Sequence, residues 1–227
     1  LHTGRELARS NLGTGVSMGI HESQSRFYEN IIGRSRAFCS VIYPWLKEHF
    51  APRLDHVTED DFYRMINKSE PSLIRTEADE LTYCLHIMVR YELEKRMFDG
   101  SLTAHDLPAE WNRLYKEYLG IDVPDDRQGV LQDSHWANGN IGYFPSYAIG
   151  SAYGAQYLLE LSKELDVDAV VRSGDLTPIN NWLEDRIWKH GCMKDPVALF
   201  ESVCGKFDPD CYVAYLEKKF TEVYGLS

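Results

Sequence analysis

Residues 16–50 read VSMGIHESQSRFYENIIGRSRAFCSVIYPWLKEHF, and their pattern of apolar side chains decides the fold class. Apolar residues recur at steps of three and four, the spacing of one face of an α-helix; they are Ile20, Phe27, Ile31, Ile32, Phe38, Val41, Ile42 and Trp45. No proline interrupts the segment before Pro44. The segment is therefore predicted to form one long helix, kinked near Gly33.

The same helical spacing continues through the rest of the chain, and strand signals are nearly absent. Thr58 is expected to cap a short helix, with acidic residues at 59–61 in its first turn. The other predicted helices run from Pro71-Ser72 to Asp99-Gly100, over 108–119, and over about 146–165, 176–190, 195–204 and 208–224. A glycine-rich loop is expected over 120–145. The fold class is therefore predicted to be all-α.

Net charge, the length of apolar runs and the cysteine pattern exclude some classes of function and location. The chain has 24 Lys and Arg against 35 Asp and Glu, a formal charge of −11, and no basic stripe that would bind nucleic acid. No apolar run reaches the roughly 18–20 residues that a bilayer span needs, and no signal peptide is recognised. Five cysteines without a C-x-x-C pair suit a reducing compartment. A cytoplasmic protein is therefore expected.

The segment His21-Glu22-Ser23-Gln24-Ser25 is the first candidate for chemistry. Small residues precede it, among them Gly15 and Gly19, and would let another backbone or a ligand come close. The alternative is a solvated helix surface on which Glu22 pairs with Arg26, four residues on.

The segment from Ile74 to Asp79 is the second candidate. Arg75 stands near the start of a predicted helix, where its guanidinium could hold a carboxylate in a bidentate manner. The alternative is a surface salt bridge between Arg75 and Asp79.

The glycine-rich loop is the third candidate, with Gly129–Trp136 followed by Gly142–Tyr147. His135, Tyr143 and Tyr147 are polar donors that could stabilise an oxyanion. The alternative is a structural histidine beside two tyrosines that serve packing.

These segments, H-E-S-Q-S, I-R-x-x-A-D and G-x-x-Q-D-x-H-W in this order, resemble the carboxypeptidase Taq family of zinc metallocarboxypeptidases. The flanks NIIGRSRAF (30–38) and GYFPSYAIG (142–150) agree with the resemblance. It implies a long-helix, zincin-type (neurolysin-like) fold, in which residues 1–227 form a single C-terminal catalytic subdomain. It also implies removal of C-terminal residues from peptide substrates, a zinc cofactor and a homodimer.

The resemblance further implies roles for single residues. Glu22 would be the third zinc ligand, with His21 as its neighbour in the substrate site. Arg75 would bind the terminal carboxylate of the substrate, and Gln132 would contact the substrate or, with Asp133, orient the loop. The candidates for polarising the scissile carbonyl are His135 and one of two tyrosines, Tyr143 or Tyr147.

One departure from the family pattern stands out, because the chain contains no H-E-x-x-H sequence. In the family this motif supplies two zinc-binding histidines and the general base. We therefore expect that an N-terminal half is missing from this chain, which alone would be inactive and would not retain zinc. The alternative is a stand-alone helical binding or scaffold protein derived from the family. A di-metal site of His21, Glu22, Glu29 and His86 is disfavoured, because Glu22 and Glu29 lack the E-x-x-H spacing.

Overall fold

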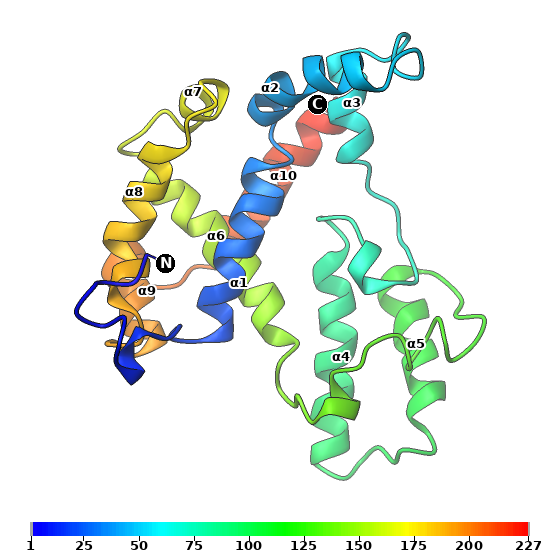
Figure 1. The fold of residues 1–227 in the computed structure, drawn as a ribbon. Coiled ribbons are helices and arrows are strands. Elements are labelled where there is room, and N and C mark those ends of the chain that lie inside the picture. The colour runs from blue at the N-terminus through cyan, green and yellow to red at the C-terminus, as the bar shows by residue number, and fades with distance from the viewer. Residues whose placement is uncertain (1, 227) are drawn as a thin grey trace. The chain divides into compact units, whose positions relative to one another are not determined.

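A computed structural model describes residues 2–226, and every regular element within that range is helical (Figure 1). The all-α prediction is thus confirmed. The chain divides into two compact units, unit 1 from the described residues of Leu1–Asn67 and Ile149–Ser227, and unit 2 from Lys68–Ala148. Each unit is described by itself, and whether the chain acts as a single subdomain stays a prediction.

Unit 1 contains most of the helices. These are α1 (Met18–Arg26), the π-helical segment η2 (Phe27–Ile32), α2 (Arg36–His49), α3 (Glu59–Ile66), the larger part of α6 (Pro145–Leu161), α7 (Val167–Arg172), α8 (Thr177–Arg186), α9 (Pro196–Cys204) and α10 (Asp210–Tyr224), with short 3-10 turns η1 (Asn11–Gly13) and η5 (Trp188–His190). Its core is apolar and fully buried around Phe27, Tyr157, Leu183 and Phe200. The short helix α7 was not predicted.

The single helix predicted over residues 16–50 is wrong, because Ser35 separates two helices. Ser35 has an extended backbone, with φ −74° and ψ 153°, and its Oγ accepts a hydrogen bond from the N–H of Phe38. Ser35 is thus the N-cap of α2, and the side-chain bond replaces the backbone bond that a continuous helix would make. The predicted helix at 58–66 is confirmed, since Thr58 and Asp61 form a capping box at the start of α3.

Unit 2 is built on two long helices, α4 (Tyr83–Phe98) and α5 (Leu107–Leu119), which pack side by side (Figure 1). The 3-10 turns η3 (Arg75–Glu77) and η4 (Trp136–Asn138) lie in the flanking segments. Val89, Leu93, Trp111 and Tyr115 are buried between the helices. The helix predicted from Pro71-Ser72 therefore begins only at Tyr83.

The late start of α4 has a local cause in the carboxylate of Asp79. This group accepts hydrogen bonds from the backbone N–H groups of Glu70, Leu81 and Thr82 and from the hydroxyl of Ser69. A side chain that binds nearby backbone donors competes with helix formation. The segment before Tyr83 is consequently a set of turns, and α4 forms where this competition ends.

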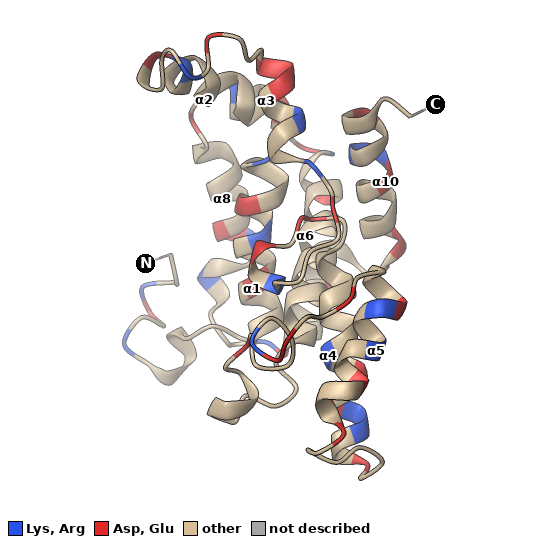
Figure 2. Cartoon of the chain, turned by 90° about the vertical axis from the view of Figure 1, so that its right-hand side faces the viewer, with Lys and Arg blue, Asp and Glu red and all other residues tan. Residues whose placement is uncertain are grey.

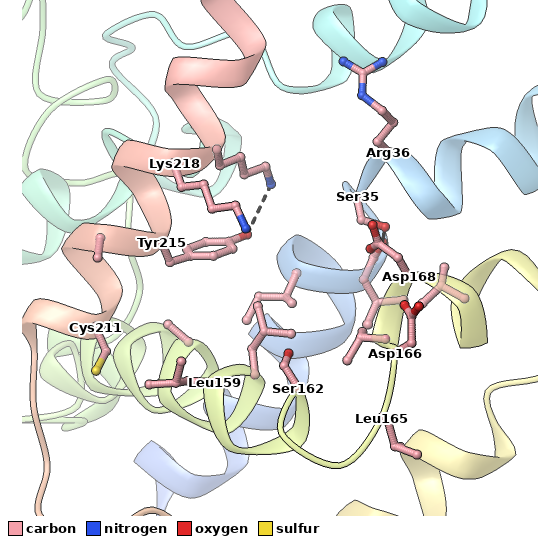
Figure 3. Close-up of a pocket in the computed structure, with 18 of the residues that line it drawn as sticks. Ser35, Arg36, Leu159, Ser162, Leu165, Asp166, Asp168, Cys211, Tyr215 and Lys218 are labelled. Atoms are coloured by element: carbon pink, nitrogen blue, oxygen red, sulfur yellow. Dashed lines mark hydrogen bonds between the residues drawn. The ribbon is translucent and has the colours of Figure 1, made fainter.

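A cavity of about 1010 Å³ lies in unit 1 (Figure 3). Residues of α2, α6, α7 and α10 and of the segment between α6 and α7 line it, including Arg36, Ser162, Asp166 and Tyr215. None of the residues that the sequence marked for chemistry borders this cavity.

Charged residues of both signs are spread along the helices (Figure 2). On α5, for example, Glu110, Arg113 and Glu117 form successive ion pairs. Within residues 2–226 no helix has the length and apolar character that a bilayer crossing requires.

Candidate active site

Glu22 lies on α1 where α6 comes closest to it. A Cβ atom placed on Gly150 of α6 would lie 2.5 Å from Glu22 Cβ and 2.8 Å from its carbonyl carbon, well inside van der Waals contact. Only glycine therefore fits at position 150 without moving a helix. The carboxylate itself accepts a hydrogen bond from Ser25 Oγ at 2.9 Å. The backbone of Glu22 is thus held by packing and one of its oxygens by a neighbouring hydroxyl.

The other residues of this segment explain why it forms a rigid helix. Ser23 is fully buried, and its hydroxyl donates to the carbonyl of Ile20 at 2.6 Å. The side chain of Gln24 donates to Ser23 Oγ and accepts from the indole N–H of Trp188, both at 2.9 Å. These bonds tie α1 to η5.

The imidazole of His21 lies directly over the backbone of Gly15, where a Cβ would come within 1.6 Å of its Nε2. His21 and Gln24 also border a cavity of about 380 Å³ in unit 1. The small residues before the H-E-S-Q-S segment therefore do permit close approach, and at Gly15 the approaching group is His21 itself.

Arg75 is buried in unit 2, with an exposed fraction of 5%, and its partner is Asp133 rather than Asp79. Its Nη2 donates to Asp133 Oδ1 at 2.7 Å, its Nε donates to the same oxygen at 3.1 Å, and its Nη1 donates to Tyr83 Oη at 2.8 Å. The predicted pair with Asp79 is wrong, because Asp79 holds the turns before α4. Arg75 stands in a 3-10 turn and not at the start of a long helix.

Arg90 on α4 is a second buried partner of Asp133, and sequence reasoning missed it. It is 0% exposed, and its Nε and Nη2 lie 2.7 and 2.6 Å from Asp133 Oδ2. One carboxylate thus lies between two guanidinium groups. A signal for this residue existed in the sequence, because polar residues recur on one helical face at steps of three and four: Tyr83, His86, Arg90 and Glu94. All four are buried.

Gln132 links the same groups through its amide. Its Oε1 accepts from the backbone N–H of Arg75 and from Arg90 Nη2, each at 2.9 Å. Its Nε2 donates to the carbonyls of Leu73 and Gln128, each at 3.0 Å. The amide is therefore committed to holding the loop, the role expected of Gln132 with Asp133, and its predicted contact with substrate stays a prediction.

His135 and Tyr147 form a hydrogen-bonded pair, with 3.0 Å between Nε2 and Oη. The tautomer of the imidazole decides which of the two atoms donates. Tyr143 packs close by, with ring centroids 5.4 Å from His135 and 5.3 Å from Tyr147. The guanidinium carbon of Arg75 lies 4.8 Å from the centroid of the Tyr147 ring, within cation–π distance. Unit 2 thus brings together the donors predicted from the third segment.

The surroundings of His135 favour the neutral form of its imidazole. Burial lowers the pKa of His135 below its ordinary value; Asp133 opposes this shift, while the charges of Arg75 and Arg90 add to it. His86 is fully buried, and burial together with the charges of Arg90 and Arg75 lowers its pKa to about 3. His86 Nδ1 lies 3.1 Å from Tyr115 Oη. A neutral His135 offers one ring nitrogen as donor and the other as acceptor.

A metal site does not arise from this chain's own described residues. Between residues 2 and 226 there is no group of three or more His, Cys, Asp or Glu side chains that could hold a metal ion. The described side chains of this chain therefore do not form a complete metal centre by themselves, and Glu22 could supply only one of its ligands.

Comparison with known proteins identifies the family. The sequence-family model of the carboxypeptidase Taq (M32) metallopeptidases matches residues 2–220 of this chain. The chain belongs to the carboxypeptidase Taq (M32) family. The resemblance noted in the three sequence segments is thereby confirmed.

The relatives of the chain are carboxypeptidases. Carboxypeptidase 1 of Bacillus subtilis is 44% identical over 220 residues, which is 96% of this chain and 44% of the relative. Thermostable carboxypeptidase 1 of Thermus thermophilus is 44% identical over 216 residues, 94% of this chain and 42% of the relative. The chain thus spans less than half the length of the curated relatives it matches.

Solved structures agree with the fold. The crystal structure of the M32 carboxypeptidase from Deinococcus radiodurans superposes with a TM-score of 0.95 at 38% identity, covering 99% of this chain and 46% of that one. A structure of the Pyrococcus furiosus carboxypeptidase, described as Apo-Mg, gives a TM-score of 0.94 at 40% identity, covering 97% of this chain and 44% of that one. The long-helix architecture is thus that of M32 carboxypeptidases.

Proposed function

We propose that this chain is the C-terminal portion of a zinc-dependent carboxypeptidase that releases C-terminal amino acids from peptides. The observation that carries the proposal is the 44% identity over 220 residues with a relative named Carboxypeptidase 1. Because the chain spans only 44% of that relative, we infer that the activity also needs the remaining part of such an enzyme.

The proposed role of Glu22 is to supply one carboxylate ligand to the metal. Gly150 and Ser25 hold this residue in place, which suits a ligand whose position must not vary. A metal held in part by Glu22 would act as a Lewis acid on the peptide carbonyl. The further ligands would belong to the part of the enzyme that this chain does not span.

We infer that His135 and Tyr147 act together on the carbonyl of the bond to be cut. When Nε2 of His135 carries the proton, it donates to Tyr147 Oη, and the tyrosine hydroxyl is then available to donate to an oxyanion. Cation–π contact with Arg75 stabilises the ring of Tyr147 in its position. Tyr143 is the alternative donor, and it packs against both residues.

The buried salt bridge with Asp133 supports a positioning role for Arg75, since it joins the η3 turn to the loop that carries His135. Binding of the substrate's terminal carboxylate by Arg75 stays a prediction, as does contact of His21 and Gln132 with substrate. The test for Arg75 compares peptides with free and amidated C-termini. If Arg75 binds the terminal carboxylate, Arg75→Lys should lose more rate on the free acid than on the amide, because an ammonium cannot reproduce the bidentate fork.

A chimera tests the proposal as a whole. This chain would replace the matching portion of Bacillus subtilis Carboxypeptidase 1, and release of C-terminal residues would be measured with zinc present. We expect the chimera to be active, the chain alone to be inactive, and Glu22→Ala in the chimera to lose both activity and metal. An inactive but folded chimera would instead favour the alternative, a helical binding or scaffold protein derived from the family.

The homodimer and the cytoplasmic location also stay predictions. The described cysteines form no disulfide, which is consistent with the reducing compartment expected from the sequence.

A further inference from the structure

Glu94 is a buried carboxylate on α4, 5% exposed, that belongs to none of the three sequence segments. Its Oε1 accepts a hydrogen bond from the indole N–H of Trp136 at 2.7 Å. The same oxygen accepts a second hydrogen bond from the backbone N–H of Gly142 at 3.1 Å. Two points of the active-site loop thus converge on one atom of α4.

These two points are the neck of a closed loop. Trp136 directly follows His135, and Gly142 directly precedes Tyr143. Between them the chain turns back, since the N–H of Asn140 donates to the carbonyl of His135 at 2.9 Å. The loop tip at 137–142 is exposed, whereas the carboxylate at the neck is buried. Glu94 therefore holds together the two backbone positions from which His135 and Tyr143 project.

The two hydrogen bonds to Glu94 attach the loop firmly to α4. A hydrogen bond to an ionised carboxylate is roughly twice as strong as one between neutral groups. The indole of Trp136 also packs edge-on against Trp111 and Phe144, with centroid distances of 6.2 and 5.7 Å. The indole N–H is therefore aimed at Glu94 by packing as well as by charge.

We propose that Glu94 is a positioning residue for catalysis, which fixes the spacing of His135 and Tyr143 by closing the neck of their loop. It acts through Trp136 and Gly142 and does not itself contact substrate. The importance of this spacing rests on the proposed function, in which Tyr143 packs against His135 and Tyr147 and is the alternative donor, but the attachment itself can be measured without any activity.

The attachment is tested on the chain alone by amide hydrogen exchange. Glu94→Ala removes both hydrogen bonds, Glu94→Gln keeps a neutral acceptor, and Trp136→Phe removes the indole donor while keeping an aromatic ring. We expect exchange at Gly142 to rise at least about tenfold in Glu94→Ala and by less in Glu94→Gln. Glu92→Gln is the matched control, because Glu92 lies on the same helix with its side chain 34% exposed and paired with Lys95. It should leave this exchange unchanged. Exchange at Gly142 that does not respond to Glu94→Ala would overturn the proposal.

Its importance for catalysis is tested in the chimera with Bacillus subtilis Carboxypeptidase 1. A misplacement of about 1 Å can cost a hundredfold in rate, so Glu94→Gln should lower kcat about ten- to a hundredfold with little change in KM. Trp136→Phe should lower kcat in the same direction, and Glu92→Gln should match the wild type. An inactive wild-type chimera would overturn the proposed function. An active one whose Glu94→Gln variant keeps its kcat, despite faster loop exchange, would overturn only the positioning role.

Discussion

The substitution Asp133→Asn removes the one negative charge that lies between two buried guanidinium groups. In the wild type, Asp133 Oδ1 lies 2.7 Å from Arg75 Nη2 and Oδ2 lies 2.6 Å from Arg90 Nη2. The side chains of Arg75 and Arg90 are only 6% and 0% exposed. Water therefore cannot replace the lost charge, and both cations would stay buried without a counterion.

Removing one partner of a buried ion pair typically costs about 3–5 kcal/mol. Asparagine keeps one oxygen acceptor, and the arginines keep contacts with Tyr83 and Gln132. We therefore expect the lower end of that range, about 3 kcal/mol. The loss should appear in unit 2, which contains all five of these residues.

The pH dependence gives an independent check. Burial tends to raise the pKa of Asp133, but hydrogen bonds and charge from Arg75 and Arg90 outweigh it and hold the pKa below its ordinary value. A carboxylate with a lowered pKa in the folded state stabilises the fold above its unfolded pKa, about 3.9, and loses this contribution as the pH falls through the folded pKa. The stability difference between wild type and Asp133→Asn should therefore be full near pH 7 and shrink below about pH 4.

Native-state hydrogen exchange of α4 and α5 measures the opening free energy of unit 2 separately from unit 1. Asp122→Asn is the matched control, since the side chain of Asp122 is 85% exposed in its pair with Lys116. It should change stability by no more than about 0.5 kcal/mol. If Asp133→Asn changed the opening free energy by less than about 1 kcal/mol, the view of Asp133 as the charge that holds this cluster together would be refuted.

Three further predictions concern packing, protonation and metal. Gly150→Ala should destabilise the chain by about 1–3 kcal/mol in thermal unfolding. Gly154→Ala should cost less, because a Cβ atom on Gly154 would meet no atom closer than 3.4 Å. Equal losses in the two variants would contradict the tight contact between Gly150 and Glu22. By NMR, His135 should titrate below its ordinary pKa of about 6.5. The free energy of unfolding should therefore fall as the pH drops below about 6.5, because the unfolded chain then binds the proton more tightly. Titration at or above about 6.5 would be inconsistent with the burial of His135. After dialysis against zinc-free buffer the chain should retain far less than one zinc per molecule by elemental analysis, since its described residues form no three-ligand group, and full retention would show that ligands beyond Glu22 exist.

The features that sequence predicted well are those with local causes. The helix over 59–66 follows from Thr58 and the acidic residues beside it, which are within one turn of each other. The candidate donors His135 and Tyr147 also lie only 12 residues apart along the chain, and the structure brings them into contact. Recognition of three short segments then carried the family assignment, which the match over 2–220 confirms.

The errors came where a side chain overrode the periodic pattern. The spacing of apolar residues runs unbroken through Ser35, yet its hydroxyl starts a new helix there. Apolar spacing likewise suggested a helix from Pro71, yet Asp79 binds the backbone before α4. In both places one polar side chain satisfies backbone donors and makes a non-helical conformation favourable.

The amino-acid sequence alone determined the all-α class, the family and the residue types available for chemistry, because these depend on periodicity and on short segments. The partners of the charged groups depend on the tertiary structure. Arg75 pairs with Asp133, 58 residues away, instead of Asp79, four residues away, because packing of unit 2 excludes water around Arg75 and Arg90 and leaves Asp133 as the counterion that both share. A buried guanidinium must be neutralised by whichever carboxylate the fold brings to it, and sequence distance does not determine which one that is.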